Sequence, residues 1–287
     1  MIVGFIGLGT MGLPIAKRLQ RQGFDVLGWD LSETAMREFG NSASSLADIA
    51  AGCDQILTML PEGEHVEAVY EQIITVGVAT GSLFLDCSTI DVATARKLAE
   101  RVTALGHGFV DAPVSGGSEG AASGSLSFMI GGQAASIERA RSLLQAMGSK
   151  LTEFGEAGAG QAAKACHNMI CGITALGVCE SFALAEALGL DLDKFFQLCS
   201  GAAAQSWILE NRCPVPGPAP AAPASNGYAP GFAARLMAKD LGLAQRAASA
   251  SGQPTEFGAA AARRFREFVE AGAGDLDFSA IYRSIRK

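Results

Sequence analysis

The chain has 287 residues, of which 49% are hydrophobic and 18% are charged; this is typical of a folded globular protein and excludes a disordered one. The formal net charge of −7, with basic residues scattered rather than clustered, argues against a nucleic-acid partner. The length suits one large domain or two smaller ones.

Cysteine and histidine usage predicts neither disulfides nor a metal site. The seven cysteines include no CxxC pair, and the three histidines are not spaced as metal ligands. No unbroken apolar run reaches the ~18 residues of a membrane span. The N-terminus opens into a predicted strand rather than a targeting segment. We therefore expect a cytoplasmic protein with reduced cysteines, no metal and no membrane partner.

The first half of the chain alternates short apolar runs with amphipathic stretches. Compact apolar runs predict parallel strands buried on both faces, and the stretches between them predict helices. The expected strands are 2–6, 25–29, 55–60, 83–87, 108–112, 126–130 and 150–154, and the expected helices are 12–22, 64–74, 91–105 and 134–147. Such alternation is typical of an α/β, Rossmann-type, doubly wound sheet.

The pattern changes near Gly158. A long helical pattern runs over 161–188, and its interior glycines, Gly172 and Gly177, predict close packing against another element. Further helices are expected at 193–199, 233–251 and 254–271, with no strand after residue 155. We therefore expect a dinucleotide-binding Rossmann domain over 1–160 and an all-α domain over 161–287, in which 161–188 is the connecting helix.

A proline-rich segment, 213–231, interrupts the helical half. It is compatible with a flexible linker. A loop of this length inside a compact domain is more often functional, so we favour a semi-rigid loop over the active site.

A glycine-rich turn follows the first predicted strand and opens the first helix, which is the context that a dinucleotide-binding turn requires. Gly7 permits a tight turn, Gly9 lets the backbone approach a pyrophosphate, and Gly12 permits close packing of helix on strand. The pyrophosphate is expected on the helix N-terminus. The predicted contacts come from Gly7, Leu8, Gly9, Thr10, Met11 and Gly12.

Asp30 ends the second predicted strand, at the distance expected for the residue that binds the ribose hydroxyls. Its charge would repel a 2′-phosphate, and the next residue is Leu31 rather than an arginine. The cofactor is therefore predicted to be NAD rather than NADP. Leu60, Pro61 and Thr89 lie at the carboxyl ends of later strands, the edge at which ligands bind in such sheets.

Four separated motifs then resemble one family. They are GFIGLGTMGLP at 4–14, DAPVSGG at 111–117, GAGQAAK at 158–164 followed by Asn168, and LMAKDLGLA at 236–244. In this order they resemble the β-hydroxyacid dehydrogenase family, which has a 6-phosphogluconate-dehydrogenase-like fold. The long proline-rich loop, with Ser206 and Trp207 before it, is similar to that of the 3-hydroxyisobutyrate dehydrogenases within the family.

The resemblance implies the roles of the site residues. Lys164 would be the acid/base, since desolvation lowers the pKa of a lysine, and Asn168, at i+4, would hold the substrate hydroxyl. Ser115, Gly116 and Gly117 would bind the substrate carboxylate. Lys239 would contact cofactor or substrate, with Asp240 orienting it. His65 stands where relatives often carry a polar amide near the nicotinamide ribose, which leaves that contact open.

Trp207 and Phe232 have two interpretations, as a wall for the methyl branch of the substrate or as core residues.

The implied reaction is NAD-dependent oxidation of 3-hydroxyisobutyrate, a small 3-hydroxy acid, in valine degradation. Two alternatives stay open. One is a relative acting on another short 3-hydroxy acid or semialdehyde, such as a tartronate or succinic semialdehyde reductase; the other is a non-catalytic dinucleotide-binding scaffold. The long helix and the alanine-rich helical half predict a homodimer or homotetramer.

Overall fold

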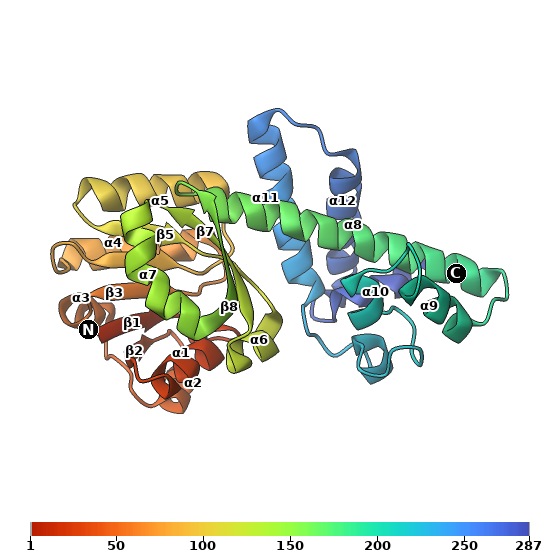
Figure 1. The fold of residues 1–287 in the computed structure, drawn as a ribbon, viewed down its shortest axis with the longest axis horizontal. Coiled ribbons are helices and arrows are strands. Elements are labelled where there is room, and N and C mark those ends of the chain that lie inside the picture. Colours follow the sequence, from red (N-terminus) through yellow and green to blue (C-terminus); the bar gives the residue numbers. More distant parts are fainter. Residues whose placement is uncertain (1, 287) are drawn as a thin grey trace. The chain divides into compact units, whose positions relative to one another are not determined.

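The computed structural model describes residues 2–286. Its contacts divide the chain into two compact units, Met1–Lys164 and Ala165–Lys287 (Figure 1). Each unit has its own apolar core and is described separately below. The boundary predicted at 160/161 remains a prediction.

The first unit is built on one sheet in the order β2-β1-β3-β4-β5-β7-β6, with β8 also paired to β7. The strands are β1 (Ile2–Ile6), β2 (Asp25–Trp29), β3 (Gln55–Thr58), β4 (Leu83–Asp86), β5 (Gly108–Asp111), β6 (Val114–Ser115), β7 (Leu126–Gly132) and β8 (Gly148–Gly155). The pairs among β1 to β5 are parallel, whereas β7 runs antiparallel to β5 and β6 and parallel to β8. The parallel strands bring their carboxyl ends to one edge, where the predicted cofactor residues lie.

Successive residues of the strands fill two cores, one on each face of the sheet. In β4, Leu83 and Leu85 lie in the first core and Phe84 in the second, because side chains alternate between faces along a strand. Helices α1 (Gly12–Arg21), α6 (Gly117–Ser123) and α7 (Ala134–Met147) cover the first face, and α3 (Leu46–Gly52), α4 (Gly63–Val76) and α5 (Val92–Ala104) cover the second. This two-sided burial explains why the strands appear in the sequence as continuous apolar runs.

The helices of the first unit follow the strands that they cover. They are α1 (Gly12–Arg21), α2 (Glu33–Phe39), α3 (Leu46–Gly52), α4 (Gly63–Val76), α5 (Val92–Ala104), α6 (Gly117–Ser123) and α7 (Ala134–Met147). The side chain of Asp91 accepts a hydrogen bond from the Ala93 N–H and so caps α5, and Gly23 follows α1 with φ of 88°.

The second unit is helical. Its elements are α8 (Ala159–Ala187), which begins in the first unit, α9 (Leu192–Ser200), α10 (Trp207–Asn211), α11 (Ala234–Ser251), α12 (Glu256–Phe268) and α13 (Tyr282–Ile285), with short turns η1 (Pro223–Asn226), η2 (Val269–Ala273) and η3 (Phe278–Ile281). A Cβ on Gly172 would lie 2.8 Å from the side chain of Leu241, so this glycine does permit the predicted close packing of α8 on α11. Gly177 differs, since a Cβ there would meet no other atom of the described chain within 4 Å.

The proline-rich segment is part of the core of the second unit, and the flexible-linker interpretation is wrong. Cys213, Val215, Ala219 and Ala222 are buried in that core. The Tyr228 hydroxyl donates to the Pro214 carbonyl over 2.7 Å and so closes the segment on itself. The buried side chains and this hydrogen bond favour the semi-rigid interpretation, and the position of the segment over the active site stays a prediction.

The fold class is confirmed: a doubly wound sheet with helices on both faces is followed by an all-helical unit. Three details differ from expectation. The sheet is mixed near β7, because β6 and β7 form a short antiparallel pair that the sequence did not indicate. The short helices α2, α3, α6, α10 and α13 were also not predicted. Finally, on length and composition alone α8 is long and apolar enough to cross a membrane, a property shared by core helices of soluble proteins. The sequence-based expectation that no segment could span a membrane considered only unbroken apolar runs, and it therefore did not identify α8.

Candidate cofactor and proton-transfer site

In the glycine turn between β1 and α1, Gly9 borders open space, whereas Gly7 and Gly12 have no room for a side chain. A Cβ on Gly7, where φ is 98°, would lie 2.3 Å from the Met59 carbonyl oxygen, and one on Gly12 would lie 1.7 Å from the Gly7 carbonyl oxygen. A Cβ on Gly9 would meet nothing within 4 Å among the described residues, and Gly9 and Thr10 are exposed. The turn is therefore tightly packed beneath and open above, as a pyrophosphate site requires.

The N-terminus of α1 is suited to an anion. Met11 precedes the helix and offers no capping side-chain hydrogen bond, and no acidic residue of the described chain lies in the first turn. The first N–H groups and the positive end of the helix dipole can thus face a phosphate. Leu8 differs from its neighbours in the turn, because its side chain is buried in the core.

Asp30 lies beside the glycine turn at the end of β2. Its carboxylate accepts from the Leu8 N–H over 2.6 Å and from the Ser32 N–H over 2.7 Å. These two bonds fix the carboxylate at the edge of the turn, and Leu31 beside it is 85% exposed. The Asp30 carboxylate thus lies where the hydroxyls of a ribose would be bound. Leu31, the next residue, offers no positive charge for a 2′-phosphate.

The ends of β3 and β4 are joined by a hydrogen bond in which the Leu60 N–H donates to Ser88 Oγ over 2.8 Å. This bond brings together the two predicted cofactor segments, Leu60–Pro61 and Ser88–Thr89. His65 lies in the first turn of α4, after β3, and is exposed. All of these residues lie at the carboxyl edge of the sheet.

Lys164 is buried, at 8% exposure, and its Nζ donates to the Val114 carbonyl over 2.7 Å. Val114 is followed directly by the predicted carboxylate-binding residues Ser115, Gly116 and Gly117. Both glycines have positive φ, of 136° and 64°, which turns the backbone away from β6 into α6. The structure thus connects the lysine amine with the residue directly before this segment.

Asp111 and Gly160, for which no role was predicted, fix the first turn of α8. The buried carboxylate of Asp111 accepts from the Gly158 N–H over 2.7 Å and from the Gln161 N–H over 2.9 Å. Burial is the main influence on this carboxyl group and raises its pKa to about 6. A Cβ on Gly160 would lie 2.4 Å from the Met129 carbonyl oxygen, so this turn packs directly on the sheet.

In the second unit, Asn168 and Lys239 share one partner. Asn168 Nδ2 donates to Asp240 Oδ2 over 2.5 Å, and Lys239 Nζ lies 3.5 Å from Asp240 Oδ1. Asn168 and Asp240 are each 4% exposed. Asp240 therefore orients Asn168 as well as Lys239, although only its link to Lys239 was predicted. Asn168 is four residues after Lys164 on the same helix, so the two side chains leave one helix face.

The two predicted wall residues differ in burial. Trp207 is 59% exposed and lies 5.2 Å from the Arg212 guanidinium, which excludes its interpretation as a core residue. Phe232 packs edge-on against Phe278, with ring centroids 6.1 Å apart, and is partly buried in the core of the second unit.

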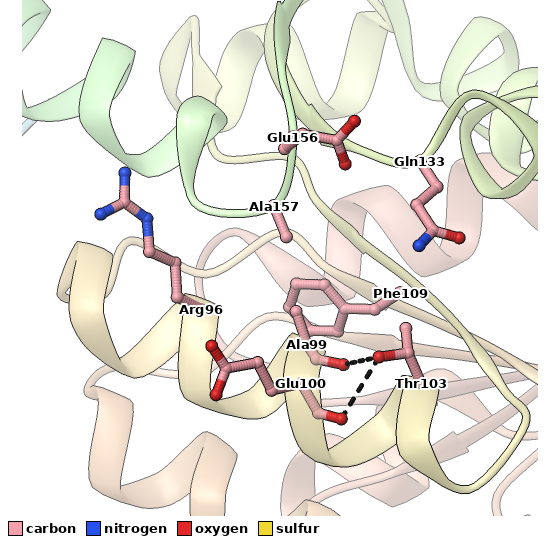
Figure 2. A pocket seen from close by; sticks show the side chains of 8 residues that line it. All are labelled: Arg96, Ala99, Glu100, Thr103, Phe109, Gln133, Glu156 and Ala157. Carbon is pink, nitrogen blue, oxygen red and sulfur yellow. Dashed lines mark hydrogen bonds between the residues drawn. The ribbon is translucent and has the colours of Figure 1, made fainter.

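A hollow of about 190 Å³ lies elsewhere on the first unit, between α5 and the residues that lead into α8 (Figure 2). Its lining includes Arg96, Gln133 and Glu156, and Thr103 Oγ1 donates to two carbonyls of α5 beside it. These residues are all different from the predicted site residues. Among residues 2–286, no three His, Cys, Asp or Glu side chains gather as metal ligands.

Comparison with known proteins gives the family. Residues 2–155 match the model described as the NAD-binding domain of 6-phosphogluconate dehydrogenase. Residues 158–285 match the model described as NAD-binding of NADP-dependent 3-hydroxyisobutyrate dehydrogenase. The chain is 40% identical to human mitochondrial 3-hydroxyisobutyrate dehydrogenase over 99% of this chain and 87% of that one. The chain belongs to the 3-hydroxyisobutyrate dehydrogenase family of β-hydroxyacid dehydrogenases.

Two further relatives refine the comparison. The chain is similar to an NAD-dependent L-serine dehydrogenase of Pseudomonas aeruginosa, with 40% identity over 97% of this chain and 96% of that one. It is also similar to the solved structure of Mycobacterium tuberculosis 3-hydroxyisobutyrate dehydrogenase with L-serine, with a TM-score of 0.95, 40% identity, and coverage of 100% and 99%. The predicted family and the NAD cofactor are confirmed, and the protein is a member of a family of NAD-dependent hydroxyacid dehydrogenases.

Proposed function

We propose that this protein oxidises 3-hydroxyisobutyrate to methylmalonate semialdehyde in valine degradation, with Lys164 as the acid/base. The observation that carries the proposal is the buried amine of Lys164, which donates to the carbonyl of Val114, directly before the Ser115–Gly117 segment. Bound NAD supplies the hydride acceptor, and the hydride comes from C3 of the hydroxy acid. The residues of the chain bind the acid and receive the proton.

Lys164 takes the hydroxyl proton as the C3–H bond breaks, so that the alcohol becomes an aldehyde and the lysine becomes an ammonium. Burial favours this role, because a desolvated lysine more readily exists as the neutral base. Asn168 is assigned to the substrate hydroxyl, since Asp240 accepts one N–H of its amide and fixes the side chain. The Ser115 hydroxyl and the backbone N–H groups of Gly116 and Gly117 are assigned to the carboxylate.

The cofactor contacts are part of the same proposal. Gly7, Gly9, Thr10, Met11 and Gly12 are assigned to the pyrophosphate, with the backbone of Leu8 beside them. Asp30 is assigned to the adenosine ribose, and Leu60, Pro61, His65 and Thr89 to the nicotinamide side. Lys239 is assigned to cofactor or substrate.

L-Serine is the second candidate substrate, because one relative described above is named an L-serine dehydrogenase and the similar solved structure contains L-serine. It has the same CH2OH–CH–COO⁻ skeleton as 3-hydroxyisobutyrate, with an ammonium group in place of the methyl. An apolar wall such as Trp207 or Phe232 favours the methyl, whereas a carboxylate such as Asp240 favours the ammonium.

The test is a panel of kcat/KM values with NAD for 3-hydroxyisobutyrate, L-serine, glycerate and 4-hydroxybutyrate. The proposal expects 3-hydroxyisobutyrate to be preferred, and a higher value for L-serine would overturn it. Lys164→Ala should lower kcat by about 10³-fold, as expected for loss of a general base, while NADH still binds. An unchanged kcat would remove Lys164 from the mechanism.

The proposal extends to assembly and location. Ile170 and Leu184 on α8 are 65% and 60% exposed, which favours burial of this helix in a homodimer or homotetramer. Light scattering of the wild type and of Ile170→Lys tests this, and a monomeric wild type would exclude it. The seven free thiols support a cytoplasmic, reducing location, which cell fractionation tests.

A further inference from the structure

Gln161 occupies an unusual place in the first unit. It lies three residues before Lys164 on α8 and is only 1% exposed. Its side-chain Nε2 donates to the Ser88 carbonyl over 2.8 Å, and its Oε1 accepts from the Ile90 N–H over 3.1 Å. One amide therefore holds the loop after β4 at both a carbonyl and an N–H.

That loop is itself bonded to the neighbouring strand ends. Ser88 Oγ accepts from the Leu60 N–H over 2.8 Å, and the Ser88 N–H donates to Asp86 Oδ1 over 3.1 Å. Asp86 is fully buried at the end of β4. The segments assigned to the nicotinamide side, at the ends of β3 and β4, are thus both hydrogen-bonded to Ser88 or to its neighbours.

The backbone of Gln161 is fixed at the same time. Its N–H donates to Asp111 Oδ2, and the Gly158 N–H donates to the other oxygen of that carboxylate. One turn later, Lys164 Nζ reaches the Val114 carbonyl. The first turn of α8 is therefore attached to the end of β5 through Asp111 and to the end of β4 through the Gln161 side chain.

We propose that Gln161 is a positioning residue for hydride transfer, which sets the distance between the nicotinamide-side loops and the helical turn that carries Lys164. The inference rests on the proposed role of Lys164. Gln161 acts through Ser88, Ile90 and the α8 backbone, and it has no chemical role in the reaction.

The chemistry of the amide explains why this position needs glutamine. The site requires one donor for the Ser88 carbonyl and one acceptor for the Ile90 N–H, both out of contact with water. Methionine has a similar length but leaves both backbone groups unpaired. Glutamate supplies the acceptor but sets a second oxygen against the Ser88 carbonyl. A protonated glutamic acid restores the pattern, since its O–H donates to Ser88 and its C=O accepts from Ile90.

The experiment compares the complete protein with Gln161→Met and Gln161→Glu in steady-state assays with NAD from pH 5.5 to 9.5. Gln55→Met is the matched control, because Gln55 is a buried glutamine (3% exposed) at the opposite end of β3. The assay uses whichever hydroxy acid has the highest kcat/KM with the wild type. NADH affinity, from fluorescence quenching, and thermal midpoints are measured on every variant.

For Gln161→Met we expect kcat to fall about 10²-fold, as for a misplacement of about 1 Å at a reacting centre. NADH affinity should stay within about threefold of the wild type, because the glycine turn is unchanged. A threefold change corresponds to under about 1 kcal/mol of binding free energy. For Gln161→Glu the ratio of variant to wild-type kcat should rise at least fivefold toward acidic pH, because protonation restores the donor. Gln55→Met should keep kcat even where its thermal midpoint falls.

Three results would overturn the inference: a kcat within threefold of wild type for Gln161→Met, a pH-independent ratio for Gln161→Glu, or an equal loss of kcat in Gln55→Met. If Gln161→Met does not fold, the results for Gln161→Glu and Ser88→Ala still test the inference. Ser88→Ala removes only the Leu60 link and should lower kcat about fivefold, and no change would count against the inference. Failure of the proposed function is distinguishable, because it would show in the wild-type substrate panel and in Lys164→Ala.

Discussion

The two units hold the polar side chains of the candidate site in different ways. In the first unit, Asp111, Gln161 and Lys164 are bonded to backbone atoms of neighbouring loops. In the second unit, Asn168 and Lys239 meet the side chain of one carboxylate, Asp240. Backbone partners tie a side chain to the path of the chain, so a substitution in the first unit displaces loops. Side-chain partners confine the effect of a substitution to the residues that touch.

The largest effect is expected at the glycine turn of the first unit. In Gly12→Ala the new Cβ would lie 1.7 Å from the Gly7 carbonyl oxygen, and relief of this clash must move backbone. We expect a loss of about 3 kcal/mol in the free energy of unfolding, and no measurable NADH binding by fluorescence. Gly9→Ala is the control: nothing obstructs its Cβ in the described chain, so the thermal midpoint should hold while NADH affinity falls at least tenfold. Equal stability losses in the two variants would contradict this account.

A second effect concerns pH. Burial raises the pKa of Asp111 from an ordinary 3.8 to about 6, so the folded state retains a proton that the unfolded state releases. This contribution to stability is complete below about pH 4 and is lost as the pH rises to about 6. Two pKa units at 1.36 kcal/mol each make the loss about 3 kcal/mol.

Urea unfolding of the wild type and of Asp111→Asn between pH 4 and 7 measures this loss. The asparagine does not titrate, so the stability of the wild type relative to the variant should decline over that range. Parallel curves would show that the backbone bonds to Asp111 offset its burial.

A smaller effect is expected at Asp240 in the second unit. Asp240→Ala leaves the Asn168 amide without its acceptor and Lys239 without its counter-charge, so kcat/KM should fall about 30-fold, or about 2 kcal/mol. Asp240→Asn keeps an acceptor for Asn168 and should recover part of this loss at neutral pH. Gln161→Glu, in contrast, should recover no activity at neutral pH, because an ionised carboxylate cannot donate a hydrogen bond to the Ser88 carbonyl. Equal activity of the two Asp240 variants would weaken the contrast between the units.

The smallest effect is expected at Asp30. Asp30→Ala removes the acceptor assigned to the ribose and should raise the KM for NAD about tenfold, equivalent to about 1.4 kcal/mol. The ratio of activity with NADP to activity with NAD should rise, because a negative charge has been removed. Asp30→Asn removes the charge but keeps one acceptor oxygen for the N–H groups of Leu8 and Ser32, so its KM for NAD should lie between those of the wild type and Asp30→Ala. An unchanged KM for NAD in both variants would remove Asp30 from the cofactor site.

The sequence predicted the elements of the first unit well, for a physical reason. Strands such as Leu83–Asp86 are buried on both faces, so they stand out as unbroken apolar runs. The strand Val114–Ser115 was missed because two residues carry no periodicity. Short helices such as Leu46–Gly52 depend on local capping and on the core that they cover, which sequence patterns convey poorly.

The candidate site was predicted only in part. Lys164 and Asn168 followed from the family motif, but the roles of Gln161 and Asp111 did not, because their partners are backbone groups distant in the sequence. A glutamine on an alanine-rich helix resembles any solvated side chain until the loop against it is known. The placement of the proline-rich segment 213–231 over the active site stays a prediction. The core that holds it, with Cys213 and Ala222, was not predicted.

The carboxylate of Asp277 has a consequence for the synthesis of the chain. It is fully buried and accepts from the Gly231 and Phe232 N–H groups at the end of the proline-rich segment. The helical unit therefore needs a residue that the ribosome adds 46 positions after Gly231. The sheet, complete by residue 155, can form much earlier. Nascent chains stalled at residue 270 should thus show a protease-resistant N-terminal unit and a protease-sensitive helical one.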